Sequence, residues 1–177
     1  MFSGALILLV FHVFPMTSTS TGFSQELRLC NETLKEMNIR MRTDPCPIPI
    51  RKPLLQAILT NMSNMSYDCK LEQAALARLH FGEVEPEKLC RMFRGVNVTT
   101  KTTYLEFRAT RSKNATVQGQ ASNFIKEAMS RWSHNLTEME AQHMYGREPK
   151  DFGCNFFVDT ESDENGNDTY ELCCAFN

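Results

Sequence analysis

The sequence predicts a mixed α/β domain that is stabilised by disulfide bonds, on the strength of three observations. Several segments carry apolar residues at steps of three and four, which is the pattern of amphipathic helices. The last segment instead contains two strand-like runs, residues 152–159 and 169–176, with Asn165-Gly166 between them, which is typical of a β-hairpin. The chain also has 7 cysteines, all after the N-terminal apolar stretch, and most of them are expected to pair.

The helical pattern predicts five helices. They cover residues 25–42, residues 54–61 with Pro53 in the first turn, a segment capped by Asp68, a short segment that starts at Pro86, and residues 121–136. The three closely spaced X-Pro steps at Pro45, Pro47 and Pro49 predict an extended linker over residues 43–53. Residues 102–109 are expected to form a further strand, and the acidic stretch 159–168 a solvated hairpin turn rather than a calcium loop.

The N-terminus has the layout of a secretory signal peptide. The apolar run from Ala5 to Phe14 is too short for a bilayer, which needs roughly 20 residues, and small polar residues follow it. We therefore expect a signal peptide over residues 1–22 and one secreted domain over residues 23–177, without a transmembrane anchor. The formal net charge of −2 gives no indication of a nucleic-acid partner.

Sequons for N-glycosylation are unusually frequent. Chance predicts roughly two at ordinary Ser and Thr frequencies, whereas the chain has seven, at Asn31, Asn61, Asn64, Asn97, Asn114, Asn135 and Asn167. Behind a signal peptide, this frequency predicts a surface that is largely covered by sugar.

One stretch resembles a known family. Residues 61–78 contain paired methionines (Met62, Met65), Tyr67-Asp68-Cys69, Leu71-Glu72 and Ala75, a pattern similar to the second-helix region of the CAP superfamily of cysteine-rich secretory, venom-allergen and pathogenesis-related proteins. The chain most resembles the nematode branch of Ancylostoma-secreted or venom-allergen-like proteins. Gly153-Cys154 and Cys174-Ala175-Phe176 resemble the closing strands of that family. The resemblance implies a three-layer α/β/α sandwich and an extracellular binding role.

The metal-binding cleft of that superfamily is not carried over to this chain. Its members use two His and two Glu from Gly-His-aromatic-Thr-Gln and Gly-Glu-Asn motifs, and neither motif is present. His143 and His80 match two of the positions approximately, without the neighbouring motif residues. No nucleophile motif such as GxSxG or HExxH occurs either. We therefore assign no catalytic residue, metal ligand or cofactor.

The hairpin places Cys154 within disulfide range of Cys173 or Cys174 on the facing strand, and the family position favours Cys174. Cys173 would then face the other side of the sheet and reach a helix through Cys69, and Cys30 could pair with Cys46. Cys90 is then the odd cysteine, through which a disulfide-linked dimer could form.

Together these features predict a secreted, non-enzymatic glycoprotein that binds an extracellular partner, with a host protein and modulation of host defence implied by the resemblance. The alternative is a lipid or sterol carrier with a methionine-lined groove, and a secreted hydrolase is the third hypothesis. The surface that the sequons leave bare includes the loop 144–152, so Arg147, Lys150 and Asp151 are the candidate partner-binding residues.

Overall fold

The computed structural model describes residues 46–83, 85–92, 98–112, 117–142, 149–159 and 166–177. The expected signal peptide and the helix expected over residues 25–42 lie outside these ranges. The described elements are α2 (Ile48–Asn61), β1 (Ser66–Tyr67), α3 (Cys69–Phe81), α4 (Pro86–Met92), β2 (Thr103–Ser112), α5 (Val117–Ala141), β3 (Asp151–Asp159) and β4 (Asn167–Phe176). None of the described helices is both long and apolar enough to cross a membrane.

The four strands form one mixed sheet in the order β1-β3-β4-β2. β1 pairs in parallel with the start of β3, and β4 pairs in antiparallel register with β3 on one side and β2 on the other. Because successive side chains of a strand point to opposite faces, the even-numbered residues of β4 face one layer of helices and the odd-numbered residues face another.

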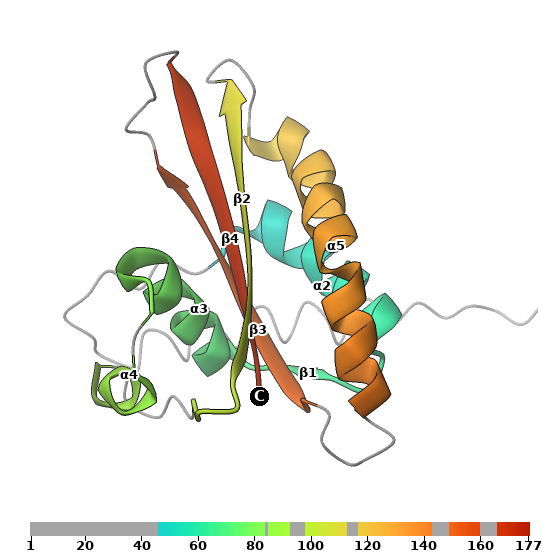
Figure 1. Ribbon diagram of the computed structural model, residues 1–177. Helices are drawn as coiled ribbons and strands as arrows, with labels where there is room; N and C mark the ends of the chain where they lie inside the picture. The colour runs from blue at the N-terminus through green and yellow to red at the C-terminus, as the bar shows by residue number, and fades with distance from the viewer. Residues whose placement is uncertain (1–45, 84, 93–97, 113–116, 143–148, 160–165) are drawn as a thin grey trace, which may run out of the picture.

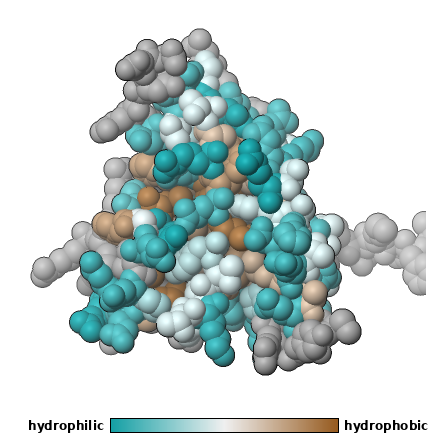
Figure 2. Space-filling model, in the orientation of Figure 1, coloured by the Kyte–Doolittle hydropathy of each residue, from teal (hydrophilic) through white to brown (hydrophobic). Residues whose placement is uncertain are grey.

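The sheet lies between two helical layers (Figure 1). α2 and α5 cover the face that carries Leu172 and Cys174, in a core that includes Phe124 and Trp132. α3 covers the opposite face, where its alanines pack against Cys173 and Ala175 and Leu89 of α4 joins the same cluster. The three-layer α/β/α arrangement expected from the resemblance is confirmed. On the side of the molecule seen in Figure 2, small hydrophobic areas alternate with hydrophilic ones.

The helix α2 begins at Ile48 rather than at Leu54, so the expected extended linker over residues 43–53 is wrong for its described second half. Pro47 is the N-cap, and Pro49 lies in the first turn, where backbone N–H groups have no intrahelical partner. Pro53 lies inside the helix and deprives only the carbonyl of Pro49 of its usual donor. Pro49 is exposed, so water can take the place of that donor.

The C-terminal hairpin is confirmed, but its turn differs from the expectation. The pairing of β3 with β4 runs from Phe152–Phe176 to Asp159–Thr169. Gly166 has the positive φ of 72° that the Asn-Gly pattern predicts. Because the pairing with β3 stops at Thr169, the connection is longer than a two-residue turn, and β4 continues back to Asn167 by pairing with Ser112 of β2.

Candidate functional site

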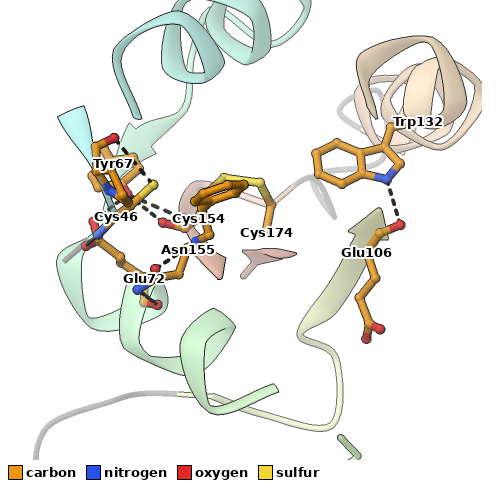
Figure 3. The surroundings of a disulfide bond; sticks show 10 residues. Cys46, Tyr67, Glu72, Glu106, Trp132, Cys154, Asn155 and Cys174 are labelled. Atoms are coloured by element: carbon orange, nitrogen blue, oxygen red, sulfur yellow. Dashed lines mark hydrogen bonds between the residues drawn. A yellow bond between two sulfur atoms is a disulfide. The ribbon is translucent and has the colours of Figure 1, made fainter. Parts of the chain in front are cut away.

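A buried polar network joins α2, β1 and α3. Glu72 is completely buried on α3, and its Oε1 accepts hydrogen bonds from the backbone N–H of Cys46 at 2.8 Å and from Arg51 Nη2 at 2.9 Å. The hydroxyl of Tyr67 donates to Glu72 Oε2 at 2.5 Å and lies 3.1 Å from the carbonyl oxygen of Cys154. Figure 3 shows Tyr67, Cys46 and Glu72 gathered on one side of the disulfide bond of Cys154.

The electrostatics of this network indicate a structural role. Burial raises the pKa of Glu72, against the opposing effects of the Arg51 charge and of the hydrogen bonds from Tyr67 and Cys46. Burial, and then the nearby Glu72 carboxylate, raise the pKa of the Tyr67 hydroxyl and of the Cys46 thiol. A thiol that stays protonated is a poor nucleophile. The network therefore fixes three elements to one another, without a group that is activated for covalent chemistry.

The sequence analysis did not identify this network. Arg51 lies in the segment for which the prolines predicted an extended linker. Glu72 was noted only as one residue of the pattern that resembles the family. One signal was available, because Glu72 lies between Leu71 and Ala75 on the helical stripe that was expected to be apolar. A charged residue on such a stripe needs a buried partner.

The cysteines follow the expected pairing only in part. Cys154 is bonded to Cys174, directly opposite it in the register, with a Cα–Cα distance of 4.0 Å. Cys69 is also disulfide-bonded, but the expected bonds of Cys46 and Cys173 are wrong, because both are buried free thiols. Cys173 does face α3 as expected and packs there among alanines. Cys30 lies outside the described residues.

The remaining cysteine, Cys90, is exposed on α4, with its Sγ 3.8 Å from the carbonyl oxygen of Val98. Its expected role as the link in a disulfide-bonded dimer stays a prediction.

The described histidines do not form a shared site. His80 lies at the end of α3, and His134 lies on α5, across the sheet, where its Nε2 is 3.3 Å from Glu138 Oε1 in an exposed pair. His143 lies outside the described ranges. Within those ranges, no three His, Cys, Asp or Glu side chains come together as a metal site would require.

An aromatic patch, defined here as His80, Phe81 and Phe157, lies where α3 ends. Figure 1 shows β2 and β4 extending beyond α3, so the end of this sheet face is not covered by that helix. The His80 ring lies 4.8 Å from the Phe157 ring and 6.2 Å from the Phe81 ring, and Phe81 is 46% exposed.

A charged pair lies beside the aromatic patch. Glu171 of β4 is directly opposite Phe157 in the register, and Arg108 of β2 is directly opposite Glu171. Arg108 and Glu171 form an ion pair at 2.5 Å, in which the Arg108 side chain is 71% exposed and the Glu171 side chain 12% exposed. Among the described residues, the part of this sheet face beyond α3 therefore presents the exposed His80 and Phe81 and the half-buried Phe157. The exposed Arg108 lies two strands from Phe157, with Glu171 between them.

Of the three residues that the sequence predicted for partner binding, the two that the structure describes lie at the opposite end of the sheet. Lys150 is exposed, Asp151 is half-buried at the start of β3, and Arg147 lies outside the described residues. The backbone N–H groups of Lys150 and Asp151 donate to the Asn177 carbonyl at 2.8 and 3.0 Å. Asp151 is six residues from Phe157 along β3, or roughly 20 Å at the rise of a strand. The structure thus separates these residues from the aromatic patch.

Among the described residues, two open grooves, each of about 320 Å³, lie beside α5. One lies between β2 and α5 and is lined by Phe107, Arg108, Ala109, Glu127, Ser130 and Arg131. The other, called here the end groove, lies beside the C-terminus and is lined by Thr99, Lys101, Thr103, Asn135, Glu138, Met139, Gln142, Pro149, Phe176 and Asn177. Most of the lining side chains of both grooves are polar or charged.

A family sequence profile agrees with the resemblance seen in the sequence. The sequence profile of the family "Ancylostoma-associated secreted protein related" matches residues 38–176. Among solved structures, the chain is similar to one titled "Structure of BmVAL-1", with 13% identity, 79% coverage of each chain and a TM-score of 0.33. No curated protein sequence shows significant similarity.

Proposed function

Because the chain belongs to the family of Ancylostoma-associated secreted protein related proteins, we propose that it is a secreted, non-enzymatic glycoprotein that acts by binding an extracellular protein partner. The observation that carries this proposal is the aromatic patch. Aromatic residues, including phenylalanine, and arginine are enriched in protein–protein interfaces relative to the rest of the protein surface. His80, Phe81 and Phe157 with the neighbouring Arg108 have this composition.

The positions of the described sequons support the choice of this surface. Asn61 and Asn64 lie just before β1, whose Ser66 is opposite Asp151, and Asn135 lines the end groove together with Pro149 and Asn177. All three are exposed and lie at the end of the sheet that is remote from Phe157. Asn167 is nearer to the patch but is half-buried and lies roughly 13 Å along β4 from Glu171. Glycans at the first three sites leave the patch accessible.

The distribution of reactive groups supports a function without catalysis. General acid–base or nucleophilic chemistry needs two or more groups within hydrogen-bond reach in an accessible site. In the described chain, the network around Glu72 brings titratable groups together, but its Arg51 and Glu72 side chains are buried. The exposed His80 contacts aromatic rings and not a nucleophile.

The finer proposals concern the identity of the partner. We propose a host protein, with modulation of host defence as the outcome, on the basis of the resemblance to secreted nematode proteins. The lipid or sterol carrier remains the alternative, although the polar lining of both described grooves does not favour it. Extraction of lipid from the purified protein would decide for the carrier.

A matched pair of variants tests the proposal. Phe81 and Ile48 are the exposed large hydrophobic residues of the described chain, at 46% and 57% exposure, and Ile48 lies at the start of α2, in the other helical layer. With protein secreted from eukaryotic cells, we expect Phe81→Ser to weaken binding to extracellular fluid components or cell surfaces about tenfold or more. Ile48→Ser should leave binding within about twofold of the wild type. Equal binding by both variants would refute the assignment of the patch.

Arg147, Lys150 and Asp151 stay a proposed second contact. Charge reversal across this segment, measured in the same binding experiment, decides whether it contributes. A loss of binding on charge reversal together with unchanged binding of Phe81→Ser would move the site to the other end of the sheet.

A further inference from the structure

The end groove contains a sequon asparagine among its lining residues. Asn135 is exposed on α5, and it shares the groove with Lys101 and Thr103 from β2 and the segment before it, and with Asn177 at the C-terminus. A sugar attached to Asn135 Nδ2 would therefore start inside the groove and not on a convex surface. We infer that the end groove holds the first sugars of an N-glycan on Asn135. This inference rests on the proposal that the chain is a secreted glycoprotein.

The lining of the groove has the chemistry that a pyranose ring requires. A sugar has hydroxyl groups at its rim and C–H bonds on its faces, so it binds best where polar groups surround an apolar surface. Thr99, Thr103, Lys101 and Gln142 provide donors and acceptors, while the largely buried Met139 and Phe176 lie beneath them. The volume of about 320 Å³ is at the lower end of the range for small-molecule sites, which suits a sugar.

The covalent tether makes weak contacts sufficient. A ligand attached within a few bonds of its site has an effective concentration in the millimolar range or above. Sugar–protein contacts that would be too weak to capture a free saccharide therefore keep a tethered saccharide in the groove for much of the time.

The geometry of α5 also determines when this glycan can be attached. The sequon needs Asn135 and the hydroxyl of Thr137 to be recognised together, but residues i and i+2 of a helix do not face each other. In the folded chain the Thr137 hydroxyl donates to the Ser133 carbonyl at 2.9 Å. Transfer to Asn135 must therefore precede the folding of α5, and the glycan is already present when the groove forms around it.

A second sequon approaches the same groove. Thr99 is the hydroxyl residue of the sequon that starts at Asn97, and Thr99 lines the groove. Asn97 itself lies outside the described residues. The groove is thus built in part from two sequons that are far apart in the sequence.

The test compares the glycans at Asn135 and Asn64 in the full chain secreted from eukaryotic cells. Asn64 is exposed in the segment before β1 and does not line the groove, so it serves as the internal reference. Native protein is treated with peptide-N-glycosidase, and the release from each site is followed by glycopeptide mass spectrometry. We expect release from Asn135 to be about tenfold slower or more, and its glycan to remain closer to the unprocessed oligomannose form. In denatured protein both sites should be released equally.

Variants of the groove distinguish two explanations for slow release from Asn135: a glycan held in the groove, or a helix that the enzyme cannot reach. Thr103→Trp fills the groove, and Lys101→Ala with Gln142→Ala removes polar side chains from its rim and leaves the apolar Met139 and Phe176 in place. Both changes are at exposed positions, and both should bring release from Asn135 towards the rate of Asn64. Thr137→Ser keeps the sequon and should behave as the wild type.

An unoccupied Asn135 in protein that carries sugar at Asn64 would overturn the inference. Equal release from Asn135 and Asn64 in the native wild type would overturn it too, as would slow release that persists in both groove variants. None of these outcomes bears on partner binding at the aromatic patch, so failure of this inference is distinguishable from failure of the proposed function.

Discussion

At the scale of single residues, Gly153 shows how closely the sheet and α3 approach each other. A Cβ atom at this position would lie 2.2 Å from the Glu72 backbone nitrogen and 2.5 Å from the Asp68 carbonyl oxygen. The backbone N–H of Asp68 donates to the Phe152 carbonyl at 2.7 Å, so α3 cannot move away without losing this bond. Position 153 therefore requires glycine because there is no room for a Cβ atom, and not because of its backbone conformation.

We expect Gly153→Ala to destabilise the fold by about 3 kcal/mol or more, because both elements must shift. Gly82→Ala is the control, since a Cβ there meets nothing within 4 Å and the strain comes only from its φ of 66°. That strain costs about 1 to 3 kcal/mol. Chemical unfolding of the two variants measures the difference, and a smaller loss for Gly153→Ala than for Gly82→Ala would contradict the packing described here.

The network around Glu72 gives a second prediction at this scale. Glu72→Gln keeps the shape but leaves the Arg51 guanidinium buried without a counter-charge, which costs about 3 to 5 kcal/mol. Tyr67→Phe removes one hydroxyl and leaves the ion pair intact, so it should cost only about 1 to 2 kcal/mol. Thermal unfolding ranks the two variants. If Tyr67→Phe proved as damaging as Glu72→Gln, the ion pair would not be the centre of the network.

At the scale of elements, the disulfide bond of Cys154 and Cys174 holds β3 to β4 across a sequence separation of 20. A loop of this size restricts the unfolded chain by about 3 kcal/mol. We expect the double change of Cys154 and Cys174 to Ala to lower the free energy of unfolding by about 2 to 4 kcal/mol. Cys173→Ala removes a neighbouring free thiol and should cost clearly less. Equal losses in urea unfolding would show that packing, and not the covalent bond, is responsible.

Much of the secondary structure was predictable from local sequence. The Asp68 cap is confirmed, with its side chain accepting from the Lys70 N–H at 2.7 Å. The start of α4 at Pro86 and the alternation of the hairpin also follow from neighbouring residues. The start of α2 was not predicted, because X-Pro steps indicate a break equally in a linker and in the first turn of a helix.

The candidate sites were less predictable, because they depend on residues that are distant in the sequence. His80 and Phe81 become an aromatic patch only when the register of β3 brings Phe157 beside them. The Glu72 carboxylate gains hydrogen-bond donors only when the fold brings Cys46 and Arg51, from α2 and the segment before it, next to α3. The end groove combines β2, α5 and the C-terminus. No local sequence pattern predicts these contacts between distant residues.

At the scale of the whole molecule, the two ends of the sheet have different chemistry. One end carries Asn61, Asn64 and Asn135, together with the end groove and Lys150. The other carries the aromatic patch and the Arg108–Glu171 pair, with the half-buried sequon residue Asn167 four residues beyond Glu171 along β4. If sugars occupy the first end, a protein partner can approach most closely at the second. This division also places Lys150 and Asp151 on the end that carries the three sequon residues Asn61, Asn64 and Asn135.

Site-specific photocrosslinking tests this account most directly. A photoreactive residue is placed at position 81 in the aromatic patch, at position 150 at the other end, or at position 48 on α2. Each glycosylated protein is then exposed to extracellular fluid and cell surfaces. We expect a discrete protein adduct from position 81 and none above background from position 48, while position 150 reports whether the proposed second contact forms. A discrete adduct from position 150 or 48, with none from position 81, would contradict the claim that the chain binds its partner through the aromatic patch.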